Sequence, residues 1–285
     1  MAKNNFGGSW TENKIDVIIK YLIEYLKIMN KRNFELIYFD GFAGSGEIES
    51  SKYKNLIEGV ASKVIEIEKP IGFDVYYLVE LNKAKKESLE KFLEDKYPEK
   101  FTQKKIYIVQ ADCNSKLVGL AKYLNDHKSA RALAFIDPQG MQVKWKSIEI
   151  FKNLGIDLWI LVPTGIGFNR LLEKNGKIPV EWMQILKETL GLEEDEILTH
   201  FYKKIEQENL FEEKEDTFKK QKYGIKKITE LYRKKLSEIF EHVSIPYEMK
   251  NSVGSPMFHL ILATNKEPGL KIANYIIGKK SNENK

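Results

Sequence analysis

Apolar residues recur along the chain at two different spacings, one typical of helices and one typical of strands. Residues 9–29, SWTENKIDVIIKYLIEYLKIM, carry apolar side chains three and four positions apart, which predicts an amphipathic helix. Short apolar runs follow, and each of them ends in polar or small residues. These runs, which predict five strands, are residues 35–40, 75–80, 106–112, 132–138 and 157–163.

The predicted strands show no alternation of apolar and polar residues. Such strands are buried on both faces of a parallel sheet, and amphipathic segments such as residues 82–97 suit crossover helices between them. Near residue 250, two further strand patterns flank the short turn NSVGSP, so these two strands must be antiparallel. The expected fold class is therefore α/β: a Rossmann-like, doubly wound, mostly parallel sheet that ends in an antiparallel hairpin.

Charge density divides the chain into three parts. Residues 171–241 are rich in charged side chains at helical spacing, and we interpret them as a helical insertion whose basic second half can line a substrate surface. Residues 1–170 then hold an N-terminal helix and the α/β core with its ligand site. Residues 242–285 supply the last strands and a helix that complete this core.

The composition limits the kinds of chemical site that the chain can form. Cys113 is the only cysteine among 285 residues, which excludes an internal disulfide and a zinc site made of several thiolates. The four histidines show no metal-ligand spacing, so we expect no metal site. No apolar run is long enough to span a membrane, and we expect a cytoplasmic protein without a membrane partner. The net charge of +5 is compatible with a polyanionic partner but does not require one.

The first predicted strand leads into the glycine-rich segment DGFAGSG, residues 40–46. Its G-x-x-G-x-G spacing is neither the dinucleotide fingerprint nor a P-loop. The segment resembles motif I of class I S-adenosylmethionine-dependent methyltransferases, and it is very close to the DPFAGSG form of nucleic-acid amino-methyltransferases. This resemblance implies S-adenosyl-L-methionine as cofactor, with Asp40 holding its ammonium group directly or through water. The cofactor contacts that it implies are Asp40, Gly41, Phe42, Ala43, Gly44 and Gly46. The alternative is a glycine-rich turn without a ligand.

Acids also follow the second and third predicted strands. In the family role, Glu80 accepts hydrogen bonds from the ribose hydroxyls of the cofactor; a merely solvated side chain is the alternative. Asp112 and the backbone N–H of Cys113 resemble motif III, which contacts the adenine. Asp112 can equally be the N-cap of the next helix, and the two roles are compatible. Forty residues separate Asp40 from Glu80, so an insertion is expected between them.

The fourth predicted strand ends in AFIDPQG, which contains Asp137 and Pro138. Nucleic-acid amino-methyltransferases place Asp/Asn-Pro-Pro-aromatic here, and oxygens of that motif accept hydrogen bonds from the target NH₂. Gln139 and Gly140 replace the last two positions, which removes the aromatic ring that stacks on a flipped base. The motif also resembles that of tRNA guanine-N2 dimethyltransferases. The catalytic residues implied are Asp137, Pro138 and Gln139, and an ordinary turn is the alternative.

Substrate contacts are expected around the same motif and after the fifth strand. Met141, Trp145 or Phe168 can replace the missing stacking ring. Asn169 and Arg170, in PTGIGFNRLL, lie on the same predicted edge of the sheet. Arg170 can contact a phosphate or pair with an acid of the charged insertion.

The motifs taken in order resemble one group, the three-Cys-motif partner proteins of bacteria and phages. The resemblance spans about residues 9 to 280 and rests on YFDGFAGSG, YYLVELN, ALAFIDPQGMQVKW, IDLWILVPTGIGFNRLL and FHLILATN. That group is regarded as methyltransferase-like and takes its name from a genomic neighbour with a three-cysteine, radical-SAM-like motif. The resemblance thus implies a possible protein partner of that kind, and it supplies no substrate.

Three functions remain open at this point. The first is methyl transfer from S-adenosylmethionine to a nucleic acid, DNA or RNA, at an exocyclic amine of a base. The second is a binding or regulatory subunit that keeps the cofactor pocket and serves a radical-SAM-type enzyme. The third is a nuclease or defence component that uses the four strand-end acids, Asp40, Glu80, Asp112 and Asp137, to hold Mg²⁺.

Overall fold

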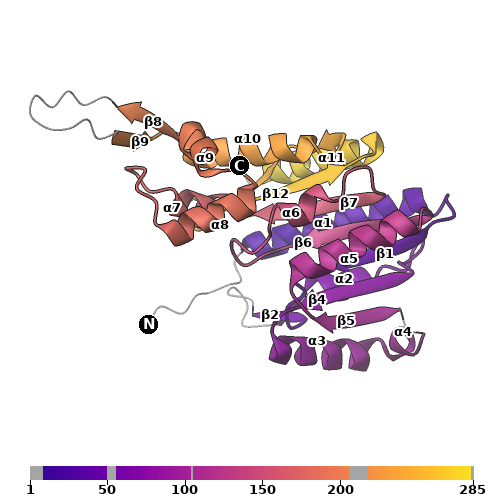
Figure 1. Cartoon of the computed structure of the whole chain (residues 1–285). Coiled ribbons are helices and arrows are strands. Elements are labelled where there is room, and N and C mark those ends of the chain that lie inside the picture. Colours follow the sequence, from indigo (N-terminus) through magenta and orange to yellow (C-terminus); the bar gives the residue numbers. More distant parts are fainter. Residues whose placement is uncertain (1–8, 50–55, 104, 206–216, 284–285) are drawn as a thin grey trace, which may run out of the picture.

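A mostly parallel sheet of eight strands forms the centre of the protein (Figure 1). The computed structural model describes residues 9–49, 56–103, 105–205 and 217–283. The strands of the sheet are β1 Glu35–Asp40, β4 Val75–Glu80, β5 Ile106–Gln110, β6 Ala130–Ile136, β7 Ile156–Val162, β10 His242–Val243, β11 Tyr247–Lys250 and β12 Pro256–Thr264. They are ordered β10, β12, β7, β6, β1, β4, β5, and β11 also pairs with β12.

The strand directions confirm the predicted fold class. β1 pairs in parallel with both β4 and β6, and β5 and β7 extend the parallel sheet on either side. β12 is antiparallel to β7 and to β11, so the predicted hairpin joins the sheet through its second strand. All seven residues of β7 are buried, as expected for a strand with neighbours on both sides and helices on both faces.

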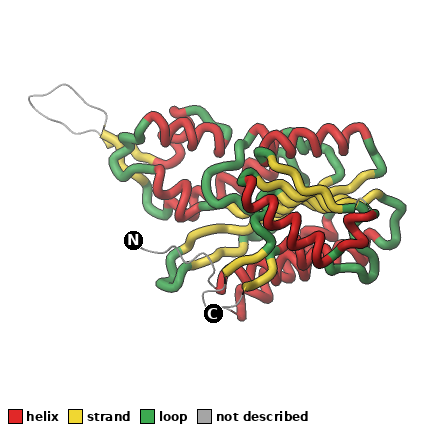
Figure 2. Tube along the Cα trace, turned by 90° about the horizontal axis from the view of Figure 1, so that it is seen from below, coloured by secondary structure: helices red, strands yellow, loops and turns green. Residues whose placement is uncertain are grey.

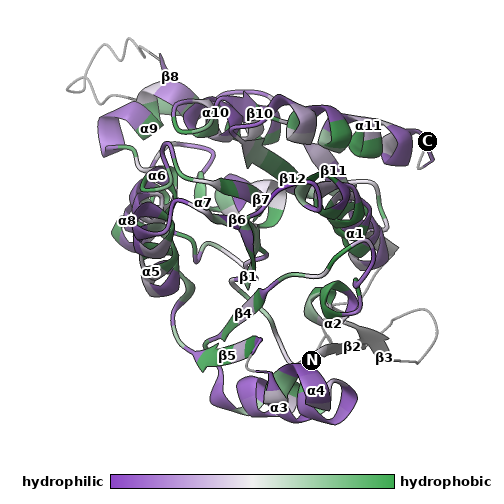
Figure 3. Cartoon of the chain, turned by 90° about the vertical axis from the view of Figure 1, so that its right-hand side faces the viewer, coloured by the Kyte–Doolittle hydropathy of each residue, from purple (hydrophilic) through white to green (hydrophobic). Residues whose placement is uncertain are grey.

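Helices cover both faces of the sheet (Figures 2 and 3). One face packs against α1 Ser9–Met29, α2 Val60–Ile65, α3 Lys83–Lys96 and α11 Glu267–Glu283. The other packs against α5 Cys113–Asp126, α6 Lys146–Glu149, α8 Val180–Leu190, α9 Glu194–Phe201 and α10 Gly224–Ser237. Successive residues of β1 point to opposite faces: Tyr38 belongs to the first core and Phe39 to the second. The short α4, Pro98–Thr102, follows α3.

An insertion separates β1 from β4, as the spacing of Asp40 and Glu80 predicts. It contains the antiparallel pair β2 Glu47–Glu49 and β3 Leu56–Glu58, followed by α2. The extra residues therefore lie between the glycine loop and α2, and they leave the pairing of β1 with β4 intact.

The charged segment 171–241 is not wholly helical, which corrects the prediction. After the π-helix η1 Thr164–Phe168 and the short α7 Asn169–Leu171 come α8 and α9, and then two paired antiparallel strands, β8 Tyr202–Ile205 and β9 Thr217–Lys220. Lysine and glutamate favour helices in isolation, but contacts to the rest of the protein override that preference here. Apolar side chains of α8, α9 and α10 belong to the same core as one face of the sheet, while the domain limits at residues 170 and 241 stay a prediction.

None of the helices within the described residues combines the length and the apolar character that crossing a membrane requires.

Candidate active site

The carboxyl ends of the parallel strands bring the predicted acids to one edge of the sheet. Asp40 is the last residue of β1 and lies opposite Phe135 of β6, so the chain that leaves β1 is close to Asp137. From β1 the chain proceeds first to β4 and β5 on one side and then to β6 and β7 on the other. Ligands of open α/β sheets bind at such a switch point, here between β1 and β6.

The glycine loop needs glycine for two separate reasons. Gly44 and Gly46 have φ angles of +70° and +88°, a left-handed conformation that other residues rarely adopt. A Cβ atom on Gly44 would meet nothing within 4 Å, so space is open above this residue. Gly41 instead sits in a crowded place, where a Cβ would lie 2.6 Å from Cys113 Sγ and 2.8 Å from Ile136 Cδ1.

This crowding gives a prediction for stability. Gly41→Ala should destabilise the protein by about 1–3 kcal/mol, because the methyl group must displace two packed side chains. Cys113→Ala removes the nearer obstacle, so the double variant should be less destabilised than the sum of the single variants. Urea unfolding of the four proteins measures the coupling energy. Strictly additive effects would contradict the proposed contact.

Asp40 is a buried carboxyl group, with only 2% of its surface exposed. Its Oδ1 accepts a hydrogen bond from the backbone N–H of Phe42 at 3.0 Å, and its Oδ2 accepts one from the Tyr38 hydroxyl at 3.2 Å. Burial, in spite of the bond from Phe42 and with a smaller contribution from the nearby Asp137, raises the pKa of Asp40 to about 7. A carboxylate in such a place is stabilised by any cation that a ligand brings to it.

Glu80 fixes the glycine loop to the end of β4. Its Oε2 accepts a hydrogen bond from Gly44 N at 3.0 Å, and its Oε1 accepts one from Asn82 N at 2.8 Å. A carboxylate can accept about four hydrogen bonds, so each oxygen retains a lone pair. The side chain is half-buried and can bind two hydroxyl groups of a ligand while still holding the loop.

Asp112 is exposed and caps α5, because its Oδ1 accepts a hydrogen bond from Ser115 N at 3.1 Å. The N-cap role is thus confirmed, and the contact with adenine stays a prediction compatible with it. Cys113 is buried against the glycine loop, and burial raises the pKa of its thiol. A neutral, packed thiol of this kind is not a nucleophile.

Asp137 forms an ion pair with Lys14, a residue that the sequence interpretation missed. Lys14 lies in the first turns of α1, and only 6% of its side chain is exposed, against 22% for Asp137. It precedes the buried Ile18 and Tyr21 by four and seven positions, so it occupies the apolar stripe of the helix. The sequence signal for this ion pair was a lysine within the apolar stripe of the helix, because buried lysines are almost always paired with an acid.

The loop after Asp137 is held by hydrogen bonds within the chain. Gln139 N donates to Gln142 Oε1 at 3.0 Å, and Asn114 of α5 bridges to Gln142 O at 2.9 Å and to Lys144 N at 2.8 Å. Gln139 itself is exposed, while Pro138 is buried. The sequence also allows Asn114 as the N-cap of α5, but Asp112 has that role, and the two bonds of Asn114 instead tie this loop to the helix that starts at Cys113.

The aromatic rings predicted to stack on a base are buried, which corrects that part of the prediction. Trp145 is 4% exposed and contacts the ring of Tyr232 edge to face at 5.6 Å, with Lys235 Nζ 4.7 Å from its own ring centre. Phe168 is 2% exposed and also lies against Tyr232. Both rings belong to the core, so their burial contradicts direct substrate contact. Met141 is half-buried and stays a candidate.

Asn169 and Arg170 follow η1, on the same edge of the sheet as the acids. The carbonyl oxygen of Asn169 accepts a hydrogen bond from Lys220 Nζ at 2.7 Å, and its side chain is half-buried. Arg170 is exposed and forms no ion pair with any residue that the structure describes. Its contact with a phosphate therefore stays a prediction.

Comparisons with known proteins support the fold and nothing finer. No family model matches the sequence, and no curated protein is significantly similar to it. The structure is similar to that of protein LPL1258 from Legionella pneumophila, of the DUF519 family, with a TM-score of 0.53 at 14% identity over 96% of this chain and 93% of that one. This likeness shows a shared fold.

Methyltransferases occur among the more distant structural neighbours. An rRNA methylase from Streptococcus thermophilus has a TM-score of 0.40 at 12% identity and covers 88% of this chain and 96% of its own. Trm1 from Pyrococcus horikoshii, in complex with S-adenosyl-L-methionine, has a TM-score of 0.37 at 12% identity, over 95% of this chain and 71% of that one. Likeness at this level carries no argument about the activity of this chain.

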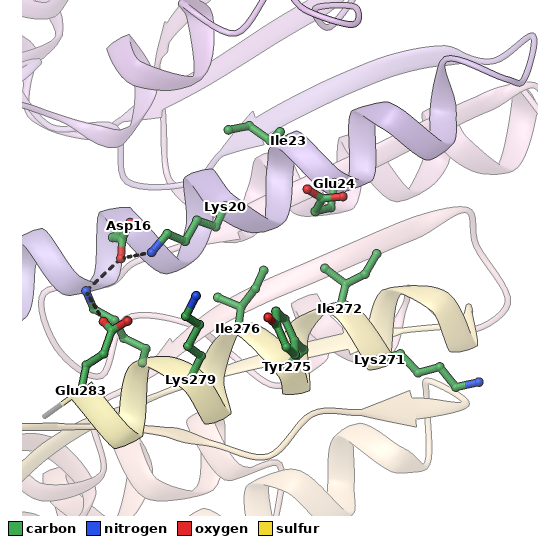
Figure 4. A pocket seen from close by; sticks show the side chains of 11 residues that line it. Asp16, Lys20, Ile23, Glu24, Lys271, Ile272, Tyr275, Ile276, Lys279 and Glu283 are labelled. Atoms are coloured by element: carbon green, nitrogen blue, oxygen red, sulfur yellow. Dashed lines mark hydrogen bonds and ion pairs between the residues drawn. The ribbon is translucent and has the colours of Figure 1, made fainter. Parts of the chain in front are cut away.

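One groove on the surface does not belong to this site. A groove of about 500 Å³ runs between α1 and α11, where Ile23, Ile272 and Tyr275 line it and Asp16 pairs with Lys280 at 2.9 Å (Figure 4). It shares no residue with the predicted site.

Within the described part of the chain, no three His, Cys, Asp or Glu side chains are placed to hold a metal ion. The nuclease alternative has no metal cluster to rest on there.

Proposed function

We propose that the protein is an S-adenosylmethionine-dependent methyltransferase that modifies a nucleic acid at an exocyclic amine of a base. The observation that carries the proposal is the combination of a buried acid, Asp40, with the open space above Gly44 at the switch point of the sheet. The donors and acceptors fit the cofactor: a carboxyl group for a cation, a glycine that allows close approach, and a carboxylate for two hydroxyls.

Each part of the site has a role in this proposal. S-adenosylmethionine, when bound, supplies an electrophilic methyl group on a sulfonium. Asp40 binds the ammonium end of the cofactor, and Glu80 accepts from its ribose while it holds Gly44 in place. Asp137 accepts a hydrogen bond from the target NH₂ and orients its lone pair. The rate then comes mainly from positioning two reactants and from excluding water around the amine.

Lys14 has a defined role in the same scheme. In the absence of the methyl-accepting substrate, the ammonium group of Lys14 pairs with Asp137 and neutralises its charge. Asp137 lies near the buried Asp40. Two carboxylates close together in a partly buried site repel each other, and a cation between elements of the chain offsets that repulsion. We infer that Lys14 holds the Asp137 side chain in place, where it can accept a hydrogen bond from the amine.

Calorimetric titration with S-adenosylhomocysteine tests the cofactor site. We expect micromolar binding, with none of NAD or Mg²⁺-ATP. Gly44→Val should abolish it by filling the open space, and Gly254→Val is the matched control, since Gly254 has a φ of +79° and the same absence of neighbours within 4 Å. No binding to the wild-type protein, or equal binding by both variants, would overturn the proposal.

A regulatory subunit is the second candidate, and one observation favours it. Trp145 and Phe168, which were predicted to stack on a base, are buried, and Gln139 and Gly140 take the places of the Pro-aromatic pair of amino-methyltransferases. The resemblance to three-Cys-motif partner proteins belongs to this candidate, with a radical-SAM-like protein as the partner. A protein that binds S-adenosylhomocysteine, transfers no methyl group to DNA or RNA, and stimulates such an enzyme would fit it.

A further inference from the structure

The two-stranded ribbon formed by β8 and β9 is attached to the edge of the sheet that carries the candidate site. Lys220 Nζ donates to the carbonyl oxygens of Asn169 and Leu172, both at 2.7 Å, and the Tyr202 hydroxyl donates to Glu173 O at 2.7 Å. These carbonyl oxygens belong to residues 169–173, the segment that directly follows η1, and η1 itself follows the carboxyl end of β7. The ribbon extends outward beside α7 and α9 (Figures 1 and 2).

The two faces of the ribbon have different surroundings. Tyr202 lies opposite Lys220, and Lys203 lies opposite Lys219. Residues directly opposite each other share a face, and neighbours along a strand point to opposite faces. The face with Tyr202 and Lys220 packs against the segment after η1, so Lys203 and Lys219 point away from it, and both are exposed.

The Lys203–Lys219 pair works against the stability of the ribbon. Like charges directly opposite each other on one face destabilise an antiparallel pair of strands. Neither lysine forms an ion pair with any residue within the described ranges. Such an arrangement has no structural benefit, whereas two adjacent ammonium groups are well placed for successive phosphates of a polyanion.

The surroundings of this pair are also basic. The described residues in 169–177, 202–205 and 217–227 contain ten lysines and arginines and one acid, Glu173. The described residues of these three segments therefore carry an excess of positive charge. Residues 206–216, which carry six acids and one lysine in the sequence, lie outside the described residues.

We propose that this surface, the exposed ribbon face of Lys203 and Lys219, binds the phosphate backbone of a nucleic-acid substrate. The inference rests on the proposed function, because it names the surface that holds the substrate of that same site. Backbone contacts of this kind supply affinity and orientation but no sequence specificity. Recognition of the base itself is left to the residues around Asp137.

Fluorescence anisotropy with labelled single-stranded and duplex RNA and DNA oligonucleotides tests the surface. Lys203→Glu/Lys219→Glu should weaken binding about tenfold or more, and the dependence of log K on log salt should become shallower by about two phosphate contacts. The matched control is Lys31→Glu/Lys128→Glu, which makes the same charge change at exposed positions on the opposite edge of the sheet. We expect this control to stay within about twofold of the wild type.

A single variant separates a lost contact from a damaged ribbon. Lys203→Glu places a glutamate opposite Lys219, so the strands should pair better while nucleic-acid binding still falls. The four probes show whether RNA or DNA, single-stranded or duplex, is preferred. Unchanged oligonucleotide binding in both ribbon variants, or no oligonucleotide binding by the wild-type protein, would refute the proposed phosphate-binding surface.

The failure of this inference is distinguishable from failure of the proposed function. Each protein is also titrated with S-adenosylhomocysteine. If the wild-type protein binds this ligand but no oligonucleotide, the phosphate-binding surface is refuted and the cofactor site is retained. If the protein binds oligonucleotides through the ribbon but does not bind S-adenosylhomocysteine, the surface is supported and the methyltransferase proposal is refuted.

Discussion

Replacing Asp40 by asparagine is expected to make the protein more stable at pH 8 and unable to hold the proposed cofactor. The carboxyl group has a pKa of about 7 in the folded protein and an ordinary value of 3.8, chiefly because of burial. The folded state therefore holds the proton more tightly than the unfolded state does. Its contribution to stability is full below about pH 4 and is lost as the pH rises through 7.

The size of this effect follows from the pKa difference. Above pH 7 the folded protein contains a buried carboxylate, at a cost on the order of 2–4 kcal/mol relative to the protonated form. Asparagine is neutral at every pH, and its side-chain oxygen can still accept from Phe42 N. Urea unfolding should thus show Asp40→Asn gaining stability over the wild type at pH 8 and little at pH 5.

The same change should reduce affinity for S-adenosylhomocysteine by about 100-fold or more, because a buried cation would lose its counter-ion. In the wild type, affinity should rise as the pH increases from 6 to 8, since binding requires the ionised carboxylate. Asp157→Asn is the matched control: burial also raises the pKa of Asp157, which lies near the start of β7 at the other edge of the sheet. It should keep full affinity, and retained affinity in Asp40→Asn would contradict the assignment.

Asp137→Ala should abolish methyl transfer while leaving cofactor affinity within a few fold. The alanine has no oxygen that can accept a hydrogen bond from the amine, and loss of one such contact in the transition state costs about 100-fold or more in rate. Transfer of labelled methyl groups from S-adenosylmethionine to total RNA and to genomic DNA measures the effect. A binding or regulatory protein would show no transfer even before the substitution.

Lys14 extends the same experiment to the ion pair. Lys14→Met removes a charge that lowers the pKa of Asp40, so cofactor affinity at neutral pH should fall. Lys14→Met/Asp137→Ala also removes the repelling carboxylate, so affinity should recover while methyl transfer stays absent. If the double variant binds the cofactor no better than Lys14→Met, the two side chains do not act on Asp40 as a unit.

The sequence predicts those parts of the site that local residues determine. The strand-end acids and the glycine loop are short segments, and a parallel sheet brings the ends of its strands together whatever the lengths of the crossovers. Asp40, Glu80 and Asp137 therefore lie at strand ends on one edge of the sheet, as the sequence predicts, while their roles stay predictions. The close approach of Cys113 to Gly41 was not predicted.

Other parts depend on contacts between distant segments. Lys14 meets Asp137 across 123 positions of the sequence, and only the packing of α1 on the sheet brings them together. Trp145 follows the catalytic motif closely but turns into the core beside Tyr232. The ribbon of β8 and β9 has a composition that favours helix, and its pairing depends on Tyr202 and Lys220, which hold it to the segment after η1.

The position of β12 has a consequence for how the chain is made. This strand, Pro256–Thr264, lies between β7 and the pair β10 and β11, yet it follows all the other described strands of the sheet along the chain. Until β12 is synthesised, β7, the most apolar strand of the sheet, has an open edge that other chains can pair with. The nascent protein therefore depends on β12 for solubility during synthesis, and chains that stop before β12 should be the ones that aggregate or recruit chaperones.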